Sequence, residues 1–145
     1  MSDIRLIDFP KILDPRGNLT FVEFPGQAPF VIERVFWTYD VPGGETRGGH
    51  AYFRQEEIII ALSGSFDVVI TGLNGNVHRF PLNRSYYGLY IPPLTWRHID
   101  NFSTNSLALH LSSTAYRGED YIYDFEQYRA EVTSLAAQKH KTARV

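Results

Sequence analysis

Residues 57–71, EIIIALSGSFDVVIT, contain two short runs of β-branched and aromatic residues joined by Ser63-Gly64. Such runs are typical of β-strands. A Ser-Gly pair between two strand patterns indicates a hairpin or a sharp corner of the chain. We therefore predict strands at 57–63 and 65–71.

Similar short runs extend in both directions from this pair. They lie at 19–24, 34–40, 77–80, 88–91 and 106–112, and turns rich in proline and glycine separate them. Many short strands with regular turns favour a sandwich, jelly roll or barrel. In the last run three leucines alternate with small or polar residues, so His110 lies opposite the leucine face. His110 then faces either the barrel interior or a dimer surface.

The pattern changes near residue 123. Phe125, Tyr128, Val132 and Leu135 recur every three or four residues, which predicts an amphipathic helix over about 123–138. The remaining residues, 139–145, are expected to be a frayed, solvated tail. We expect one domain over 1–145, with the barrel spanning about 4–115.

Composition excludes several classes of function. The net charge is −2 and the basic residues are scattered, so we expect no nucleic-acid partner. No cysteine is present, so there is no disulfide and no thiolate metal site. The longest purely apolar run, Ile58 to Leu62, is far too short to span a membrane. The amino-terminal residues lack the pattern of a signal peptide, so we expect a cytoplasmic protein.

The densest polar and glycine-rich region is residues 43–57. If the chain is extended there, His50 and Tyr52 project from the same face. Arg47 precedes them on a glycine-rich bend that a ligand can approach closely. A second aromatic and basic cluster closes residues 88–98. This spacing resembles the cupins, which are small all-β double-stranded β-helices of the jelly-roll type.

A more specific resemblance follows from motifs that occur in order along the chain. They are Asp14-x-Arg16-Gly17-x-Leu19, Pro29-Phe30, Arg34-Val35, Arg47-Gly48-x-His50-Ala51, Gly88-Leu89-Tyr90-Ile91 before Trp96, Asn101-Phe102-Ser103 and Asp120-Tyr121-Ile122. Together they resemble the WxcM-like cupins, the family of the dTDP-sugar 3,4-ketoisomerases. The similarity covers about residues 7–128, nearly the whole chain.

The resemblance implies an enzyme that moves the carbonyl of dTDP-4-keto-6-deoxy-D-glucose from C4 to C3 through an enediolate. The 3-keto product supplies unusual deoxysugars of surface glycans such as the lipopolysaccharide O-antigen. The family implies a cupin barrel with a carboxy-terminal helix, no metal and no cofactor. It also implies a homodimer that exchanges amino-terminal strands.

The same resemblance suggests roles for individual residues. His50 matches the family's first active-site histidine and is assigned proton transfer, since imidazole titrates near neutral pH. Tyr52 is either an assisting acid or part of the wall. Arg34 and Arg47 suit the pyrophosphate, while Arg16 and Arg97 suit the sugar end. We also include Tyr39 and Trp96 among the substrate-binding residues.

Two other functions stay open. Relatives often carry histidine where Tyr52 stands, tyrosine at Phe36 and arginine at Tyr123, which would suit a non-catalytic cupin that only binds sugar nucleotides. A metal-dependent cupin enzyme would use His50, Glu56 and His98, with Tyr52 at the fourth ligand position. For Arg34, the alternative to an anionic ligand is an ion pair with Glu23 or Glu33.

Overall fold

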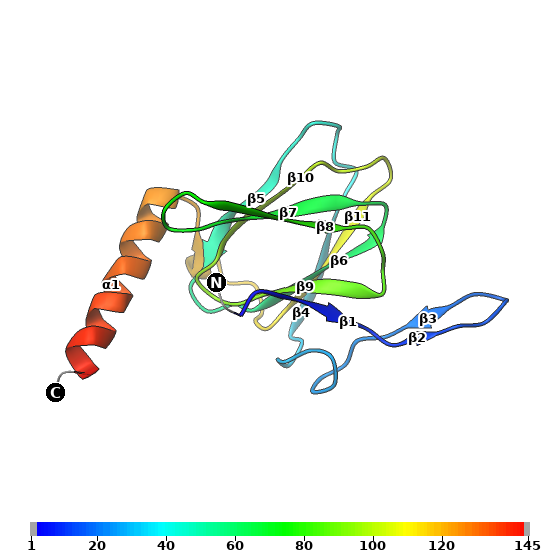
Figure 1. Ribbon diagram of the computed structural model, residues 1–145, viewed down its shortest axis with the longest axis horizontal. Coiled ribbons are helices and arrows are strands. Elements are labelled where there is room, and N and C mark those ends of the chain that lie inside the picture. Colours follow the sequence, from blue (N-terminus) through cyan, green and yellow to red (C-terminus); the bar gives the residue numbers. More distant parts are fainter. Residues whose placement is uncertain (1–2, 144–145) are drawn as a thin grey trace.

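The computed structural model describes residues 3–143, which form two facing five-stranded sheets, a projecting hairpin and a terminal helix (Figure 1). All strand pairs are antiparallel. The first sheet has the order β1 (Arg5–Asp8), β9 (Tyr87–Ile91), β6 (Glu57–Ser63), β11 (Leu107–Ser112) and β4 (Arg34–Tyr39). The second has the order β12 (Tyr121–Ile122), β5 (Arg47–Tyr52), β10 (Trp96–Asp100), β7 (Phe66–Thr71) and β8 (Val77–Leu82). The predicted all-β jelly-roll barrel with a carboxy-terminal helix is confirmed.

The Ser63-Gly64-Ser65 segment is a corner and not a hairpin. It carries the chain from β6 in the first sheet to β7 in the second. The hairpin partner of β7 is β8, and the two are joined through Asn74-Gly75. The two strand patterns of residues 57–71 therefore connect the two walls of the barrel.

The continuous apolar run of β6 arises because both faces of this strand are buried. Ile59 and Ala61 point between the two sheets. Ile58 and Ile60 point outward, where the amino-terminal segment covers them with Phe9 and Phe30. A strand buried on one face only would alternate between apolar and polar residues.

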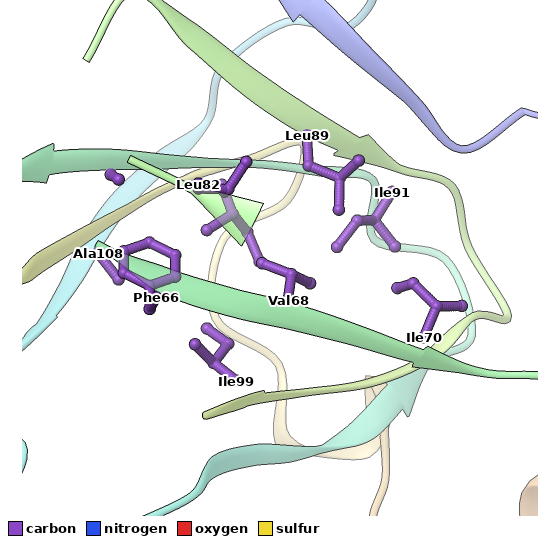
Figure 2. Packing of buried hydrophobic residues seen from close by; sticks show 10 residues of the cluster. Phe66, Val68, Ile70, Leu82, Leu89, Ile91, Ile99 and Ala108 are labelled. Carbon is purple, nitrogen blue, oxygen red and sulfur yellow. The ribbon is translucent and has the colours of Figure 1, made fainter. Parts of the chain in front are cut away.

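Apolar side chains fill one end of the space between the sheets. Figure 2 shows Phe66, Val68 and Ile70 from β7 facing Leu89 and Ile91 from β9. Ile99 of β10 and Ala108 of β11 belong to the same cluster. Arg97, two residues before Ile99, and His110, two residues after Ala108, also face inward, so the other end of the barrel interior is polar.

Four strands were not predicted, β5 was considered only as a possible extended segment, and the strand expected at 19–24 and the terminal helix differ most in length from the prediction. The missed strands are β1, β10, β12 and β2 (Lys11–Ile12), which mix apolar with charged or polar residues. In β10 one of the two inward positions is an arginine, so the strand lacks an apolar alternation. Only β3 (Leu19–Thr20) forms within the predicted strand 19–24. Paired with β2, it makes the hairpin that projects from the barrel (Figure 1).

The terminal helix α1 (Phe125–Ala143) is longer than predicted. The expected tail is helical over residues 139–143, and residues 144–145 lie outside the described part. His140 and Lys141 in the last turn interact favourably with the helix dipole, which supports this extension. Phe125, Tyr128 and Val132 pack on the barrel, whereas Leu135 is exposed. No helix within residues 3–143 is long and apolar enough to cross a membrane.

Gly64 makes a stability prediction possible. Its φ is +68°, and an added Cβ would lie 2.5 Å from Ser103 Oγ and 2.8 Å from Ser106 Cα. We expect Gly64→Ala to lower the free energy of unfolding by about 2–4 kcal/mol, since both backbone strain and steric overlap result. Chemical denaturation would measure it.

Gly75→Ala is the matched control. Gly75 has a φ of +86°, but nothing lies within 4 Å of its added Cβ. The backbone strain alone should cost about 1 kcal/mol. If both variants lost the same free energy of unfolding, steric overlap at the Gly64 corner would not be a cause of the loss.

Candidate active site

A buried carboxylate, Glu57 at the start of β6, is the centre of the polar end of the barrel. Its Oε1 lies 2.7 Å from His110 Nδ1 on β11. Its Oε2 accepts hydrogen bonds from Arg97 Nη1 at 3.3 Å and from Gln55 Nε2 at 3.2 Å. Since Arg97 lies on β10, this ion pair joins the two sheets across the barrel interior.

The surroundings of Glu57 keep it ionised. Burial by itself would raise the pKa of the carboxyl, but the attraction and hydrogen bond of His110, together with the charge of Arg97, outweigh it. The resulting pKa is about 2. Arg97 is only 1 % exposed, so an ionised partner is what makes its burial tolerable.

A second arginine joins the same network through Gln55. Arg34 Nη2 on β4 donates a hydrogen bond of 2.9 Å to Gln55 Oε1. The guanidinium lies over the Phe36 ring, and Phe36 stacks on His110 with ring centroids 4.3 Å apart. Within residues 3–143, the buried Arg34 Nε and Arg97 Nη2 have no hydrogen-bond partner. Each arginine therefore has one buried donor that no group in the described residues satisfies.

His50 lies on β5 directly opposite Arg97 of β10. Aromatic rings surround it: Tyr52 at 4.7 Å, Tyr121 at 5.2 Å and Tyr123 at 6.3 Å between centroids. Its buried Nδ1 has no hydrogen-bond partner in the described part of the chain. The exposed Tyr123 marks the solvent side of this aromatic group.

Electrostatics set different proton affinities for His50 and Tyr52. Burial first, and then the positive charge of Arg97, lower the pKa of His50 to about 4, so its imidazole is neutral at pH 7. Burial and the Glu57 carboxylate raise the pKa of Tyr52 far above its ordinary value. Tyr52 is almost fully buried beneath the Arg97 guanidinium. His50 is thus ready to accept a proton, whereas Tyr52 retains its own.

The lowered pKa of His50 predicts an unusual pH dependence. A base with a pKa of about 4 stays mostly neutral at pH 5, and it becomes protonated only as the pH falls through 4. We expect kcat/KM at pH 5 to lie within about twofold of its value at pH 7, whereas an ordinary histidine would lose roughly 30-fold. A pH–rate profile, with circular dichroism as the control for folding, measures this. An acidic limb centred near pH 6.5 would contradict it.

Two predicted binding residues lie beside this cluster. Arg47 at the start of β5 and Tyr39 at the end of β4 line a groove of about 450 Å³ together with Trp37 and Thr38. Thr38 Oγ1 lies 3.4 Å from His110 Nε2, so Thr38 points inward to the polar cluster, while its neighbours Trp37 and Tyr39 are exposed on the other face of β4. The sequence prediction is compatible with a ligand that extends from the groove to His50.

Two other predicted residues lie away from His50. Trp96 precedes Arg97 on β10, and neighbouring strand residues point to opposite faces. It therefore packs outside the barrel against Phe125 and Tyr128 of α1, with ring centroids 5.3 and 5.8 Å away. Trp96 therefore does not share the inward face of Arg97 and His50, and its assignment as a substrate-binding residue stays a prediction.

Arg16 lies at the tip of the projecting β2–β3 hairpin (Figure 1). Its side chain is 90 % exposed and pairs with Asp14 at 2.9 Å. Because the hairpin extends away from the barrel, Arg16 does not join the polar cluster of its own chain. Its predicted place at the sugar end would require the hairpin to reach another subunit.

The alternative metal site does not assemble. Glu56 accepts a hydrogen bond of 2.6 Å from Tyr90, and His98 pairs with Asp100 on the outside of the barrel. They do not converge with His50. Within residues 3–143, no group of three or more His, Cys, Asp or Glu side chains is placed to hold a metal ion.

Glu57, Gln55 and His110 had no role predicted from the sequence. The strand pattern did contain a signal, since Glu57 precedes an apolar run that is buried on both faces. His110 faces the barrel interior, one of the two positions left open for it. The ion-pair alternative for Arg34 is not found, because its partner is Gln55 and not Glu23 or Glu33.

The two antiparallel sheets define a cupin barrel. Its interior holds His50 and the hydrogen-bonded arginines Arg34 and Arg97. Residues 2–133 match the family described as FdtA, WxcM-like, C-terminal. The chain belongs to this family.

Characterised relatives share this fold and are sugar-nucleotide ketoisomerases. The TDP-4-oxo-6-deoxy-α-D-glucose-3,4-oxoisomerase of Aneurinibacillus thermoaerophilus is 32 % identical over 136 residues, which cover 93 % of this chain and 96 % of the relative. The 3,4-ketoisomerase QdtA of Thermoanaerobacterium thermosaccharolyticum, solved in complex with TDP, has a TM-score of 0.88 and 32 % identity, covering 92 % of this chain and 97 % of QdtA. A histidine-to-asparagine mutant of QdtA was solved with TDP-4-keto-6-deoxyglucose; it has a TM-score of 0.86 and 32 % identity, covering 90 % and 94 %.

Proposed function

We propose that this protein is a 3,4-ketoisomerase acting on TDP-4-keto-6-deoxy-D-glucose. The relatives named above support the reaction and the substrate. The observation that carries the proposal is His50: its imidazole is neutral at pH 7, its Nδ1 is unpartnered within the described residues, and the buried Arg97 lies opposite it.

The reaction needs one base and donors for a developing oxyanion. His50 removes the proton from C3, and the electron pair forms the C3–C4 double bond while negative charge develops on the C4 oxygen. Free donors on Arg97 and Arg34 stabilise this enediolate. After proton transfer between the two oxygens, His50 returns a proton to C4, which leaves the carbonyl at C3.

Tyr52 serves as part of the wall and not as the proton source. Its raised pKa makes the phenol a poor acid, because transfer of its proton would create a buried phenolate near Glu57. A neutral phenol still donates a hydrogen bond. Tyr52 therefore supports the position of His50, whose ring it contacts edge-on.

The groove beside the cluster suits the nucleotide part of the substrate. Arg47 brings a guanidinium for the pyrophosphate, and Tyr39 brings an exposed aromatic ring. From there, Thr38 and Arg34 lead to the sugar position next to His50. In this arrangement the nucleotide lies in the groove and the keto sugar enters the polar end of the barrel.

The first experiment is NMR of TDP-4-keto-6-deoxy-D-glucose incubated with the protein in deuterated water. A 3-keto product with deuterium at C4 supports the isomerase and reveals the configuration at C4. An unchanged sugar with broadened nucleotide signals would support the alternative, a cupin that only binds sugar nucleotides. If the protein shows no turnover and no binding of the sugar nucleotide, both proposals are overturned.

We further propose that two copies form a homodimer through the projecting hairpin. Ile12, Leu13 and Leu19 of the hairpin are exposed. On the outer face of the first sheet, Val35 on the edge strand β4 and Leu109 line an apolar groove of about 460 Å³. Exposed apolar patches of this kind mark protein interfaces, and an exchanged hairpin would cover the edge of β4.

The mass measured by analytical ultracentrifugation tests this proposal. A dimer that Leu13→Asp converts to a monomer supports it, and a wild-type monomer would overturn it. Such a dimer would also bring Arg16 to the partner subunit. The cytoplasmic location expected from the sequence and the role in surface glycans implied by the family are also parts of this proposal.

A further inference from the structure

We infer that Glu57 is a positioning residue that aligns both substrate-facing arginines, Arg97 directly and Arg34 through Gln55. The inference rests on the proposed ketoisomerase function. It concerns a carboxylate that is buried and does not itself move a proton in the proposed reaction.

The contacts of Arg97 hold its guanidinium plane in one orientation. Nε donates a hydrogen bond of 3.1 Å to the Thr95 carbonyl oxygen, and Nη1 donates to Glu57 at 3.3 Å. Only Nη2 is left without a partner in the described part of the chain. A planar guanidinium held at two nitrogens presents its third nitrogen in a defined direction. Glu57 thereby determines where the free donor points.

Glu57 also orients Arg34, indirectly, through the side chain of Gln55. Gln55 Nε2 donates to Glu57, which leaves Gln55 Oε1 facing Arg34 Nη2. Thr114 Oγ1 donates a further hydrogen bond to Gln55 Oε1 at 3.3 Å. If the Gln55 side-chain amide were turned around, its NH₂ group would face two other donors, Arg34 Nη2 and Thr114 Oγ1. The ionised state of Glu57 therefore selects the Gln55 orientation that accepts from Arg34.

Charge balance gives Glu57 a second effect on the site. The groups that face it are Arg97 from β10, His110 from β11 and Gln55, and His50 of β5 lies within electrostatic range. Without the carboxylate, Arg97 would lie buried without an anion. Fixed dipoles and charges stabilise a developing oxyanion only where their orientation is set in advance.

A structural role alone explains this arrangement poorly. A buried ion pair contributes little net stability compared with apolar residues of similar volume. The polar network nevertheless occupies the end of the barrel that holds His50, while apolar residues fill the other end. Unpartnered donors on both arginines also indicate that the network is built to meet a ligand.

The test is Glu57→Gln, which preserves size and removes the charge. We expect kcat to fall about 100-fold with KM changed less than threefold, because misplaced donors affect the transition state most. We also expect the Arg97 Nε–H signal in NMR spectra to move or broaden. A folded variant with wild-type kcat and an unchanged Arg97 signal would overturn the inference.

A double-mutant cycle separates positioning from stability. If Glu57 acts mainly through Arg97, Glu57→Gln should lower kcat by less than about tenfold in an Arg97→Lys background, since only its effect on Arg34 remains. Full additivity of the two losses would overturn the inference. Asp100→Asn is the matched control. It removes a carboxylate that pairs with Arg79 at 2.8 Å on the outside of the sheet that contains Arg97, and kcat should not change.

Two further measurements keep the outcome decisive. If Glu57→Gln does not fold, Glu57→Asp keeps the charge but withdraws the carboxylate by one methylene group. We then expect about a tenfold loss of kcat, and wild-type kcat would overturn the inference. If the wild-type protein shows no turnover, the proposed function fails, and an unchanged Arg97 signal in the variant would overturn the positioning inference separately.

Discussion

Replacement of His50 by asparagine is expected to lower kcat by about a thousandfold, the scale of a lost general base. Asparagine is close in size to imidazole but cannot accept and return a proton at neutral pH. His50 is only half-buried, and its Nδ1 makes no hydrogen bond within the described residues. The substitution should therefore leave the fold and the affinity for TDP nearly unchanged.

NMR measures turnover and calorimetry measures TDP binding, so the loss of the base is distinguished from a loss of affinity. His78→Asn is a matched control, because His78 lies exposed on β8 in the second sheet, which also contains β5. It should retain full activity. If His50→Asn also retained full activity, His50 would not be the base.

Replacement of Arg97 by methionine is expected to lower the free energy of unfolding by about 3 kcal/mol. Glu57 would keep His110 and Gln55 but lose the guanidinium that compensates its buried charge. Breaking a buried pair from one side typically costs about 3–5 kcal/mol, and the remaining partners place this case at the lower end. Urea denaturation of the variant would measure the loss.

Two companion variants test this cause. Arg79→Met removes an exposed partner of Asp67 and Asp100, and we expect a much smaller loss because solvent screens this pair. Replacement of both members of the buried pair, Arg97→Met with Glu57→Leu, should recover most of the lost stability, since no unpaired carboxylate remains. A double variant less stable than Arg97→Met would show that the isolated charge is not the cause.

Local signals predicted most of the architecture. Strands such as β4, β6 and β11 are dense in β-branched and aromatic residues, and their preference is visible in any short window. The helix was also predicted from its apolar periodicity, but its carboxy-terminal end at Ala143 was not. β10 was missed because Trp96 packs under α1 while Arg97 points into the barrel, so neither face shows the expected apolar alternation.

The candidate site was predicted only in part. His50, Tyr52, Arg34 and Arg97 converge within the barrel, and the motif that contains His50 was sufficient to select it. Trp96 was included as an aromatic side chain suited to binding substrate, but alternation along β10 places it on the face opposite Arg97.

The amino-acid sequence was enough to predict the fold class and the family, which are confirmed, and to select His50 as the candidate base. These depend on local preferences and on motifs that occupy consecutive positions. The partners of the arginines came only from the folded chain. Glu57 and Arg97 are 40 residues apart, and Glu57 and His110 are 53 apart. Their interaction exists because two sheets face each other at a particular register, which depends on the packing of the whole barrel and not on any single segment.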